Sequence, residues 1–506
     1  MMSARLMVCC LVCLAGSTAL ARSVQPEGPA RDPAEGPAAK PALVLPPDPT
    51  YPVGGVAVRA MSVEAAAEPS PVLRLTLRLR EFEKLSGNAA VDYLRAAAIV
   101  DSRSDQANRV SDLARVASDP AHHAEIRDLL KVHLDPAWPV LQEAARRDQT
   151  QWASPPTRLD YLLPDLARYR QLTRLLRLRA AYMIATGRHD DAFETARVMI
   201  EMGRRVGQGP TLIDRLVGVA IVASGLETLM ELSTSPGAPN LYWALTDLPS
   251  PVVDMTEAIR LELGFIDRAV PELREIESGR LSPESALTVW TRISDVYTEA
   301  LPDADKGSRR QEARLGLGVM NAMLFPEAAR WMQSTGKTPE QVAALPVSYV
   351  TLRYAIASYR ERNDRLLAAA SLPPAQARAI LDSTVQPASS RANLLAGLSD
   401  ILQPALGRTI SSHQQIARQV AMLRTVELLR LHAASTGSLP ATLEEIRVAP
   451  IPENPETGRP FDYVLKDGVG IITAIASDTH PPGAPAGEKD TRPPLSEMRV
   501  TLRPKP

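Results

Sequence analysis

Residues 181–193 read AYMIATGRHDDAF, and this stretch decides the fold of the middle of the chain. An apolar, alanine-rich run comes first, and Gly187 then supplies the residue that most easily ends a helix in the left-handed conformation. After a short polar turn, Ala192 and Phe193 open a second apolar run that continues to about Val206. The stretch therefore predicts two helices joined by a tight turn.

The same phrase resembles the junction of a tetratricopeptide repeat, in which an alanine lets two helices approach closely. The resemblance implies an antiparallel hairpin with Ala192 at the helix contact. It covers one hairpin, because no similar phrase recurs at the offset of about 34 residues that a regular array requires. We therefore expect helical hairpins without expecting a regular repeat.

The helix before this turn is expected to begin at Pro164 and to carry arginines on one face. Its apolar stripe is formed by Leu172, Leu175, Leu176 and Met183. The other face presents Arg170, Arg174 and Arg177. Such a row is typical of a solvated helix surface, and an anion or partner site is the alternative interpretation. The three arginines are therefore candidate partner-contact residues.

Helical patterns extend in both directions from this hairpin. The segment 210–232 is apolar on nearly every side but has too few apolar residues to span a bilayer, so it is interpreted as the central buried helix. Asn88 is a suitable cap for the first helix of the body, and a helix from Pro251 is expected to kink or restart at Pro271. Further helices are predicted near residues 104–117, 120–133, 139–148, 282–301, 304–325, 326–335, 346–370, 374–383, 388–402 and 410–435.

Two regions carry the two-residue alternation of β-strands. Leucines alternate with arginine and threonine over Pro71–Arg80, which predicts a half-buried strand, with a helix as the alternative because leucine is a mediocre strand former. Near the C-terminus, residues 461–465 and 469–475 flank a turn at Asp467-Gly468 and predict a hairpin. A last strand is expected over Met498–Leu502.

The predicted fold class is mainly α: a tetratricopeptide-like helical-hairpin bundle or solenoid with a small C-terminal β-hairpin or sheet. We expect a signal peptide over residues 1–21 and a proline-rich disordered tether over residues 22–70. An α-helical domain over residues 71–402 and a long helix with a small β module over residues 403–506 complete the predicted organisation.

The first 21 residues have the three parts of a secretory signal. Arg5 gives the positive n-region, residues 6–15 form the apolar run, and Ala19-Leu20-Ala21 is a small-x-small cleavage site. We expect cleavage near Ala21 and export to the periplasm, the cell surface or the extracellular space, with no transmembrane helix in the mature chain. All 3 cysteines lie in this segment, at Cys9, Cys10 and Cys13. A mature chain without cysteine excludes disulfides, thiol catalysis and thiolate metal sites.

Composition and motifs narrow the function classes. The formal net charge is −1 and aromatic residues make up 4% of the chain, which argues against general nucleic-acid or anionic-membrane binding and against aromatic sugar platforms. His122 and His123, with Glu125 and His133, form the densest histidine cluster, but adjacent residues of a helix point apart. The chain has no P-loop and no nucleophile elbow. We therefore expect no metal and no cofactor.

Several phrases together resemble an uncharacterised bacterial family of large exported helical proteins. The phrases are Asn88–Ala90, Gly209–Gly218, Ala238–Pro249, Leu439-Pro440 and Pro455–Phe461. The resemblance runs from about Pro71 to the C-terminus and brings no activity with it. This chain has Thr150-Gln151-Trp152 where the family commonly has Cys-Asp-Trp. The C-terminal phrases are also similar to the headgroup of type II secretion pseudopilins, which implies a helix, a proline-rich loop and a hairpin.

Two functions are compatible with these patterns. The first is an exported, non-catalytic helical scaffold or binding protein of the cell envelope, whose partner is an unknown protein or envelope component. Tyr242 and Trp243 join the three arginines as candidate contact residues, with burial between helices as the alternative interpretation. The second function is an exported hydrolase of a helical class that uses paired carboxylates as acid and base. A deep cleft with two facing Asp or Glu side chains would favour the hydrolase.

Overall fold

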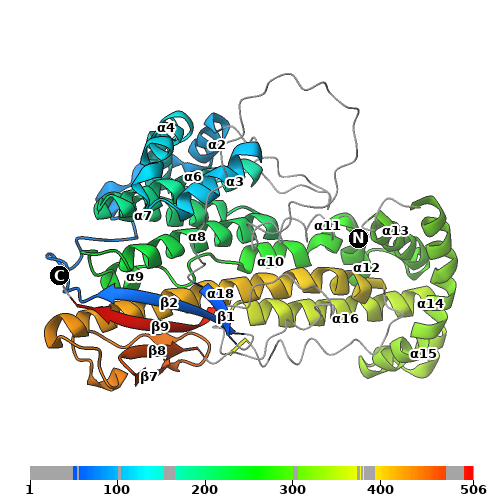
Figure 1. The fold of residues 1–506 in the computed structure, drawn as a ribbon. Helices are drawn as coiled ribbons and strands as arrows, with labels where there is room; N and C mark the ends of the chain where they lie inside the picture. The colour runs from blue at the N-terminus through cyan, green and yellow to red at the C-terminus, as the bar shows by residue number, and fades with distance from the viewer. Residues whose placement is uncertain are drawn as a thin grey trace.

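The longest helix, α18 (Leu394–Thr436), is the axis along which the rest of the structure is arranged (Figure 1). At one end it packs against α8 (Leu212–Ser233), α9 (Tyr242–Thr246) and the strand β9 (Leu495–Arg503). Toward the other end it contacts α16 (Val347–Ala370). The long helix therefore links a helical layer, a sheet and a distal group of helices.

A computed structural model describes residues 50–53, 56–100, 104–152, 166–299, 306–372, 376–377, 380, 394–474 and 495–504. These residues are mainly helical with small sheets, as the sequence predicts. The other α-helices are α2 (Ala89–Ile99), α3 (Ser104–Arg115), α4 (His123–His133), α5 (Trp138–Arg146), α6 (Leu166–Ala185), α7 (His189–Val206), α10 (Thr256–Leu263), α11 (Phe265–Ala269), α12 (Glu272–Glu277), α13 (Ala286–Glu299), α14 (Lys306–Ser334) and α15 (Pro339–Ala343). Short 3₁₀ helices are η1 (Glu81–Glu83), η2 (Pro120–His122), η3 (Pro283–Ser285) and η4 (Leu443–Glu445).

The main sheet joins the two ends of the described chain. Its strands are β1 (Thr50–Val53), β2 (Val56–Glu64), β7 (Asp462–Lys466), β8 (Val469–Thr473) and β9, in the order β1-β2-β9-β8-β7. Strand β2 pairs with β9 in parallel, and the other pairs are antiparallel. The predicted C-terminal hairpin is confirmed, and its turn residues Asp467 and Gly468 both have positive φ, at 53° and 77°. Two small pairs lie apart from this sheet: β3 (Leu85–Asn88) with β4 (Arg147–Gln149), and β5 (Glu453–Asn454) with β6 (Arg459–Pro460).

The N-terminal strands correct the predicted tether. We expected residues 22–70 to be disordered, but residues 50–53 and 56–64 form β1 and β2. Met61 and Val63 of β2 are buried in the same apolar core as the helices, which explains why this segment is ordered. The β module is therefore completed by residues from both ends of the chain. The predicted signal peptide and residues 22–49 lie outside the described residues.

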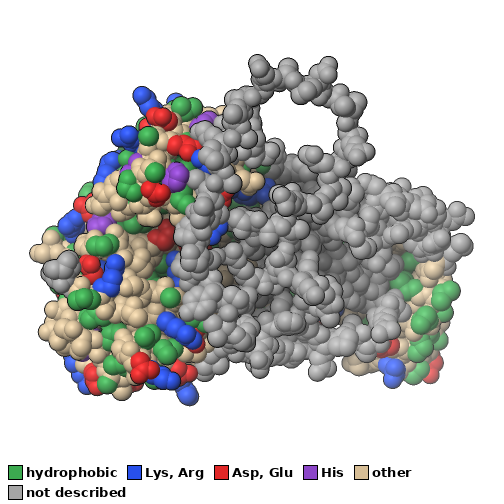
Figure 2. All heavy atoms as spheres, viewed as in Figure 1, with side chains coloured by type: hydrophobic (Ala, Val, Ile, Leu, Met, Phe, Trp, Pro, Cys, Tyr) green, Lys and Arg blue, Asp and Glu red, His purple; other side chains and the backbone are tan. Residues whose placement is uncertain are grey.

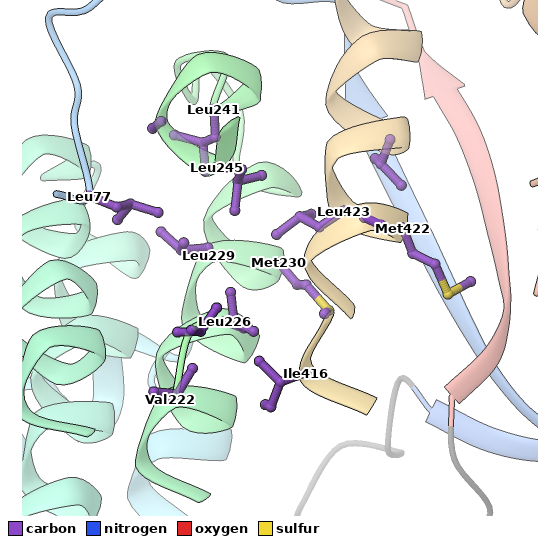
Figure 3. Close-up of a cluster of buried hydrophobic side chains, with 14 of the residues drawn as sticks. Leu77, Val222, Leu226, Leu229, Met230, Leu241, Leu245, Ile416, Met422 and Leu423 are labelled. Atoms are coloured by element: carbon purple, nitrogen blue, oxygen red, sulfur yellow. The ribbon is translucent and has the colours of Figure 1, made fainter. Parts of the chain in front are cut away.

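The helix that we expected at the centre of the core is α8. Leu212, Leu226 and Leu229 are fully buried, and Figure 3 shows α8 side chains facing α18. Among the described helices, α8 has the length and hydropathy to cross a membrane, and 72% of its most apolar window is buried inside the protein. Its burial confirms the interpretation as a core helix.

The segment Pro71–Arg80, which we call the strap, differs from the sequence prediction. It belongs neither to a strand nor to a helix and runs as turns and bends over the helices. Leu75 and Leu77 are 8% and 2% exposed, whereas Leu73 is 54% exposed. The alternation of leucine with polar residues therefore indicates which side chains the strap buries. The strap does not form a strand, because its backbone crosses the ends of α7 and α9 and has no described strand beside it to pair with.

Glycines set the distance between α7 and α8. A Cβ atom on Gly218 would lie 2.5 Å from the carbonyl oxygen of Gly203 and 2.5 Å from Cα of Gly207. Real Cβ atoms are not found at such distances from backbone, so the two helices touch backbone to backbone at this crossing. Any side chain on Gly218 would push the helices apart.

We predict that Gly218→Ala destabilises the protein by about 1–3 kcal/mol, because overpacking outweighs the better helix propensity of alanine. Gly316 in α14 has open space around the position of a Cβ, so Gly316→Ala is the matched control. The control is expected to raise stability by about 0.5–1 kcal/mol. Urea unfolding measures both, and equal shifts in the two variants would contradict the close crossing.

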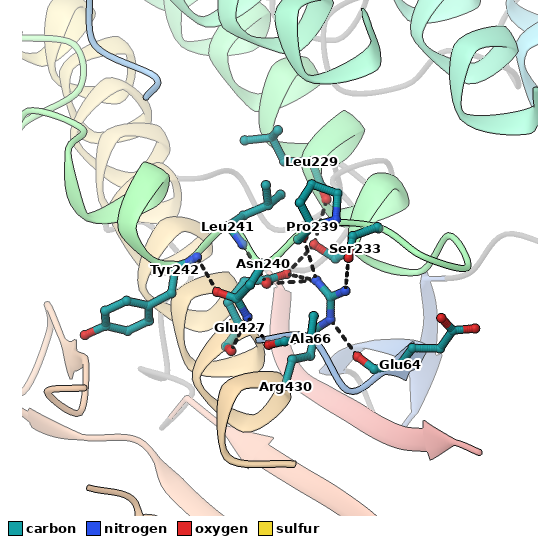
Figure 4. A network of polar contacts seen from close by, with 11 residues as sticks. Glu64, Ala66, Leu229, Ser233, Pro239, Asn240, Leu241, Tyr242, Glu427 and Arg430 are labelled. Carbon is teal, nitrogen blue, oxygen red and sulfur yellow. Dashed lines mark hydrogen bonds and ion pairs between the residues drawn. The ribbon is translucent and has the colours of Figure 1, made fainter. Parts of the chain in front are cut away.

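A buried ion pair joins the helical layer to the sheet (Figure 4). Glu427 and Arg430 of α18 have no exposed side-chain surface, and the guanidinium contacts both carboxylate oxygens at 2.9 and 2.8 Å. Arg430 also donates to the carbonyls of Glu64 at 2.9 Å, Ala238 at 2.8 Å and Pro239 at 3.2 Å. The same pair therefore touches the end of β2, the loop after α8, and α18.

The carboxylate of this pair is satisfied from the helical side. Ser233 Oγ donates to Glu427 Oε1 at 2.5 Å, and the backbone N–H of Leu241 donates to Oε2 at 2.9 Å. The Asn240 amide donates to the Glu427 carbonyl at 2.9 Å. With so many partners, the pair has the geometry that makes a buried ion pair tolerable.

We predict that Arg430→Met destabilises the protein by about 3–5 kcal/mol, because it leaves the Glu427 carboxylate buried without its cation. The control is Arg365→Met, which removes an exposed ion pair with Glu361 on α16 and is expected to change stability little. Thermal unfolding followed by circular dichroism tests both variants. If Arg430→Met and Arg365→Met have the same melting temperature, the buried ion pair does not stabilise the fold.

Candidate functional site

The strap lies across the surface with Leu75 and Leu77 inward and its arginines outward. Leu77 enters the core beside Leu229 and Leu241 (Figure 3). Arg74, Arg78 and Arg80 are exposed. The alternation that anchors the segment therefore also presents a row of guanidinium groups to the solvent.

Polar contacts hold the strap to the helices beneath it. The Arg74 guanidinium contacts both carboxylate oxygens of Asp190 at the start of α7, at 2.7 and 2.6 Å. The backbone N–H of Arg78 donates to Asp247 Oδ2 at 3.2 Å, just after α9. Arg80 closes the segment on itself, because its Nη2 donates to the Leu73 carbonyl at 2.6 Å. The strap is thus tied to the helices at two points and braced internally at a third.

A shallow hollow of about 440 Å³ opens on the strap. It is lined by Pro71, Leu73, Thr76, Arg78, Leu79, Arg80 and Asp247. Apolar side chains and two guanidinium groups thus face one open space, together with a single carboxylate. That carboxylate, Asp247, is already held by the strap backbone.

An exposed aromatic side chain follows the strap. Phe82 is 79% exposed, and its ring lies 5.9 Å from the Arg80 guanidinium carbon. It sits on η1, which is anchored through Glu83: the Glu83 side chain accepts from the Arg80 backbone N–H at 2.9 Å, and the Glu83 carbonyl accepts from Arg146 at 2.9 Å. Arg197 of α7 lies 3.6 Å from the Glu83 carboxylate. The fold therefore holds a large apolar side chain in water, which costs free energy unless something covers it.

The candidate arginines of α6 lie elsewhere. Arg177 is bound to Glu227 at 2.6 Å and to Glu231 at 2.7 Å, and both glutamates belong to α8. Arg170 and Arg174 are half-buried and also interact within the protein. The Arg177 guanidinium is therefore engaged within the protein, because α8 presents two carboxylates one turn apart toward α6.

The two aromatic candidate residues differ in their burial. Tyr242 is fully buried and its hydroxyl donates to the Pro450 carbonyl at 2.5 Å, so the alternative interpretation of burial between helices is correct for it. Trp243 is half-buried, and its Nε1 donates to Glu68 Oε1 at 2.8 Å, just before the strap. Of the five contact residues predicted from the sequence, Trp243 is the one that lies beside the strap.

The sequence analysis did not identify the strap or Phe82 as a site. A usable signal was present for the strap, which contains three arginines and no acidic residue. We interpreted the alternation as a half-buried strand. A strand prediction concerns backbone pairing and does not single out the exposed arginines as a site.

A second group of buried charges surrounds Glu201 of α7, which is 3% exposed. Arg204 and Arg205 contact its two oxygens at 2.5 and 2.6 Å. Burial raises the pKa of the nearby Tyr93 phenol well above its usual value, and the Glu201 charge raises it further. The carboxylate is neutralised by two cations and does not line the hollow, so this group is suited to holding helices together.

A further apolar surface lies on α14. Val319 and Met323 are 64% and 67% exposed, and Figure 2 shows hydrophobic side chains over this end of the molecule. The strap differs from this surface in lining a described hollow with both apolar and charged residues. The strap is therefore the better-defined site.

The histidine cluster of α4 does not form a metal centre in the described ranges. His123 Nε2 lies 2.9 Å from the Ala117 carbonyl, and His122 lies 3.8 Å from Asp119. No group of three or more His, Cys, Asp or Glu side chains that could hold a metal occurs among the described residues.

Comparison with family models, with curated proteins and with solved structures found no match. The site therefore has to be interpreted from its own chemistry.

Proposed function

We propose that this chain is an exported, non-catalytic helical scaffold that binds a protein partner at the strap surface. We use strap surface for the strap, the hollow and Phe82. The observation that carries the proposal is the anchored, exposed phenylalanine beside a mixed apolar and cationic hollow. Aromatic and arginine side chains of this kind dominate the energetics of protein interfaces.

The chemistry of the hollow favours binding over hydrolysis. Hydrolysis of the glycosidase type needs two carboxyl groups facing each other across the scissile bond. Asp247 is the single carboxylate among the residues that line the hollow, and it accepts a hydrogen bond from the Arg78 backbone. Burial raises the pKa of the Asp214 and Glu262 carboxyl groups, but neither residue lines the hollow.

Export is supported by the sequence. The positive n-region, the short apolar run and the Ala19-Leu20-Ala21 site are the parts of a cleaved secretory signal. A mature chain beginning near Arg22 would carry a proline-rich segment ahead of β1. A partner in the cell envelope is consistent with such a chain.

We also propose that α6 and α7 form a tetratricopeptide-like hairpin. The turn residue Gly187 has φ of 71°, which is the left-handed conformation expected of a helix-ending glycine. Ala192 is fully buried, and α7 packs against both α6 and α8. These features support a stack of helices whose contacts depend on small residues.

We predict that Ala192→Arg lowers stability by about 1–3 kcal/mol or more, because a long charged side chain would be forced into a filled contact. Ala185 lies at the exposed end of α6, so Ala185→Arg is the control and is expected to melt near the wild-type temperature. Differential scanning calorimetry compares the two. An unchanged melting temperature for Ala192→Arg would contradict the hairpin interpretation.

The proposed function predicts that Phe82→Ala abolishes partner capture without changing stability. The experiment is affinity purification of the tagged full chain from fractionated native cells, with bound proteins quantified by mass spectrometry. Val132→Ala is the matched control, because Val132 is a 66% exposed apolar residue on α4. Wild type and control are expected to capture the same protein, and Phe82→Ala is expected to lose it.

Three results would overturn this proposal. The first is equal capture by Phe82→Ala and the control. The second is recovery of the chain in the cytoplasmic fraction with its first residues intact. The third is turnover of a glycan, peptide or ester that Asp247→Asn abolishes, which would replace the scaffold with a hydrolase.

A further inference from the structure

We infer that the partner binds the strap surface through an extended acidic segment that carries one apolar side chain. The apolar side chain occupies the hollow and a neighbouring carboxylate contacts the Arg78 guanidinium. This inference rests on the proposed function and adds the chemistry of the partner.

The charges around the hollow are unbalanced in one direction. Two acidic residues that follow the strap already have cationic partners, because Glu81 pairs with Lys84 at 2.6 Å and Glu83 faces Arg197. Glu68, before the strap, accepts instead from the Trp243 indole. Arg74 is paired with Asp190. Two further arginines, Arg78 and Arg80, are among the residues that line the hollow.

Neither of these two cations has a carboxylate partner in the described part of the chain. Arg80 donates to a neutral carbonyl and lies over the Phe82 ring, and the structure gives the Arg78 guanidinium no ion pair. A partner carboxylate would meet both groups at the rim of a half-enclosed space, where opposite charges attract more strongly than in open water. A basic segment would be repelled.

Asp247 determines where the carboxylate can go. Its Oδ2 accepts the Arg78 backbone N–H, so it stays on one wall of the hollow as a fixed negative charge. A second carboxylate avoids that wall, because like charges at short distance repel. The acidic group of the partner is therefore directed to the side of the Arg78 and Arg80 guanidinium groups.

The size of the hollow indicates that the partner binds through a short chain segment and not through a broad folded surface. A volume of about 440 Å³ is near the lower end of the range for ligand pockets, roughly 300–1,000 Å³. Leu73, Leu79 and Pro71 supply an apolar lining for a side chain, and Phe82 extends that surface beyond the rim. An extended chain places one side chain inward and its neighbours outward, which matches an apolar anchor flanked by acids.

An anionic membrane is the other surface that cations and an exposed phenylalanine can meet. Membrane-binding patches usually carry about four to eight Lys or Arg side chains together. The hollow carries two, and it also contains Asp247, which would face the lipid phosphates. The protein segment is therefore the occupant to which we commit.

The test uses the mature full chain and a fluorescein-labelled peptide of sequence GDEDFEDG, followed by fluorescence anisotropy. Two peptides serve as comparisons: GNQNFQNG without the acids and GDEDAEDG without the apolar anchor. We expect Arg78→Gln to weaken binding of the acidic peptide by about three- to fivefold, as for loss of one partly exposed ion pair. Arg95→Gln, which alters an exposed arginine of α2, is expected to leave the affinity unchanged.

Salt and vesicles complete the design. Raising sodium chloride from about 50 to about 300 mM is expected to weaken binding of the acidic peptide and to leave binding of the neutral peptide unaffected. Equal affinity for the acidic and neutral peptides, or an unchanged affinity of Arg78→Gln, would overturn the inference. Tight binding to vesicles containing phosphatidylserine, lost in Arg78→Gln, would overturn it in favour of a membrane.

Failure of this inference can be distinguished from failure of the proposed function. Capture of one native protein that depends on Phe82, together with no peptide binding, would leave the scaffold in place and reject an acidic partner. Loss of both the capture and the peptide binding would reject the strap surface as a binding site.

Discussion

The ion pair between Glu427 and Arg430 is the interaction on which the arrangement of this protein depends. Three parts of the chain that are distant in sequence converge on it: the end of β2, the loop after α8, and α18. Because both side chains are fully buried, neither can be removed without leaving the other unpaired. The backbone N–H of Ala66, just before the strap, also donates to the Arg430 carbonyl at 3.2 Å. The side-chain pair thus fixes how the sheet meets the helices, and the α18 backbone at Arg430 also holds the segment that leads into the strap.

The helical layer depends on a different constraint, which is that glycines without side chains lie where α7 and α8 cross. Gly203, Gly207 and Gly218 let α7 and α8 meet backbone to backbone. This close approach sets how α7 lies against α8, and Asp190 at the start of α7 holds Arg74 of the strap. A polar anchor and a glycine crossing together explain why an irregular segment can be held firmly at the surface.

Local chemistry made part of this fold predictable. Gly187 and Asp467-Gly468 are turn residues whose effect does not depend on distant parts of the chain, and both turns are found where we expected them. The burial of α8 followed from its apolar composition. The other elements depend on distant partners. The strand β2 pairs with residues some 440 positions away, and Arg177 finds its carboxylates on another helix.

The candidate site was less predictable than the fold. The alternation in the strap correctly indicated that Leu75 and Leu77 are buried. It did not tell us that the backbone would cross helix ends instead of pairing with a strand. The exposure of Phe82 could not be read from the sequence, because it results from tertiary anchoring of Glu83 by Arg146 and Arg197. A single apolar residue between two acids carries no periodic signal.

The parallel pairing of β2 with β9 has a consequence for how the protein is made. Ribosomes release β2 long before its neighbour β9 in the sheet. The centre of the sheet therefore cannot close until β9 has been synthesised, and the large sequence separation makes its closure slow. A chain whose two ends must meet stays open for longer than one built from local units. This order of events would suit the export that we propose, in which the chain is threaded through a membrane before it folds.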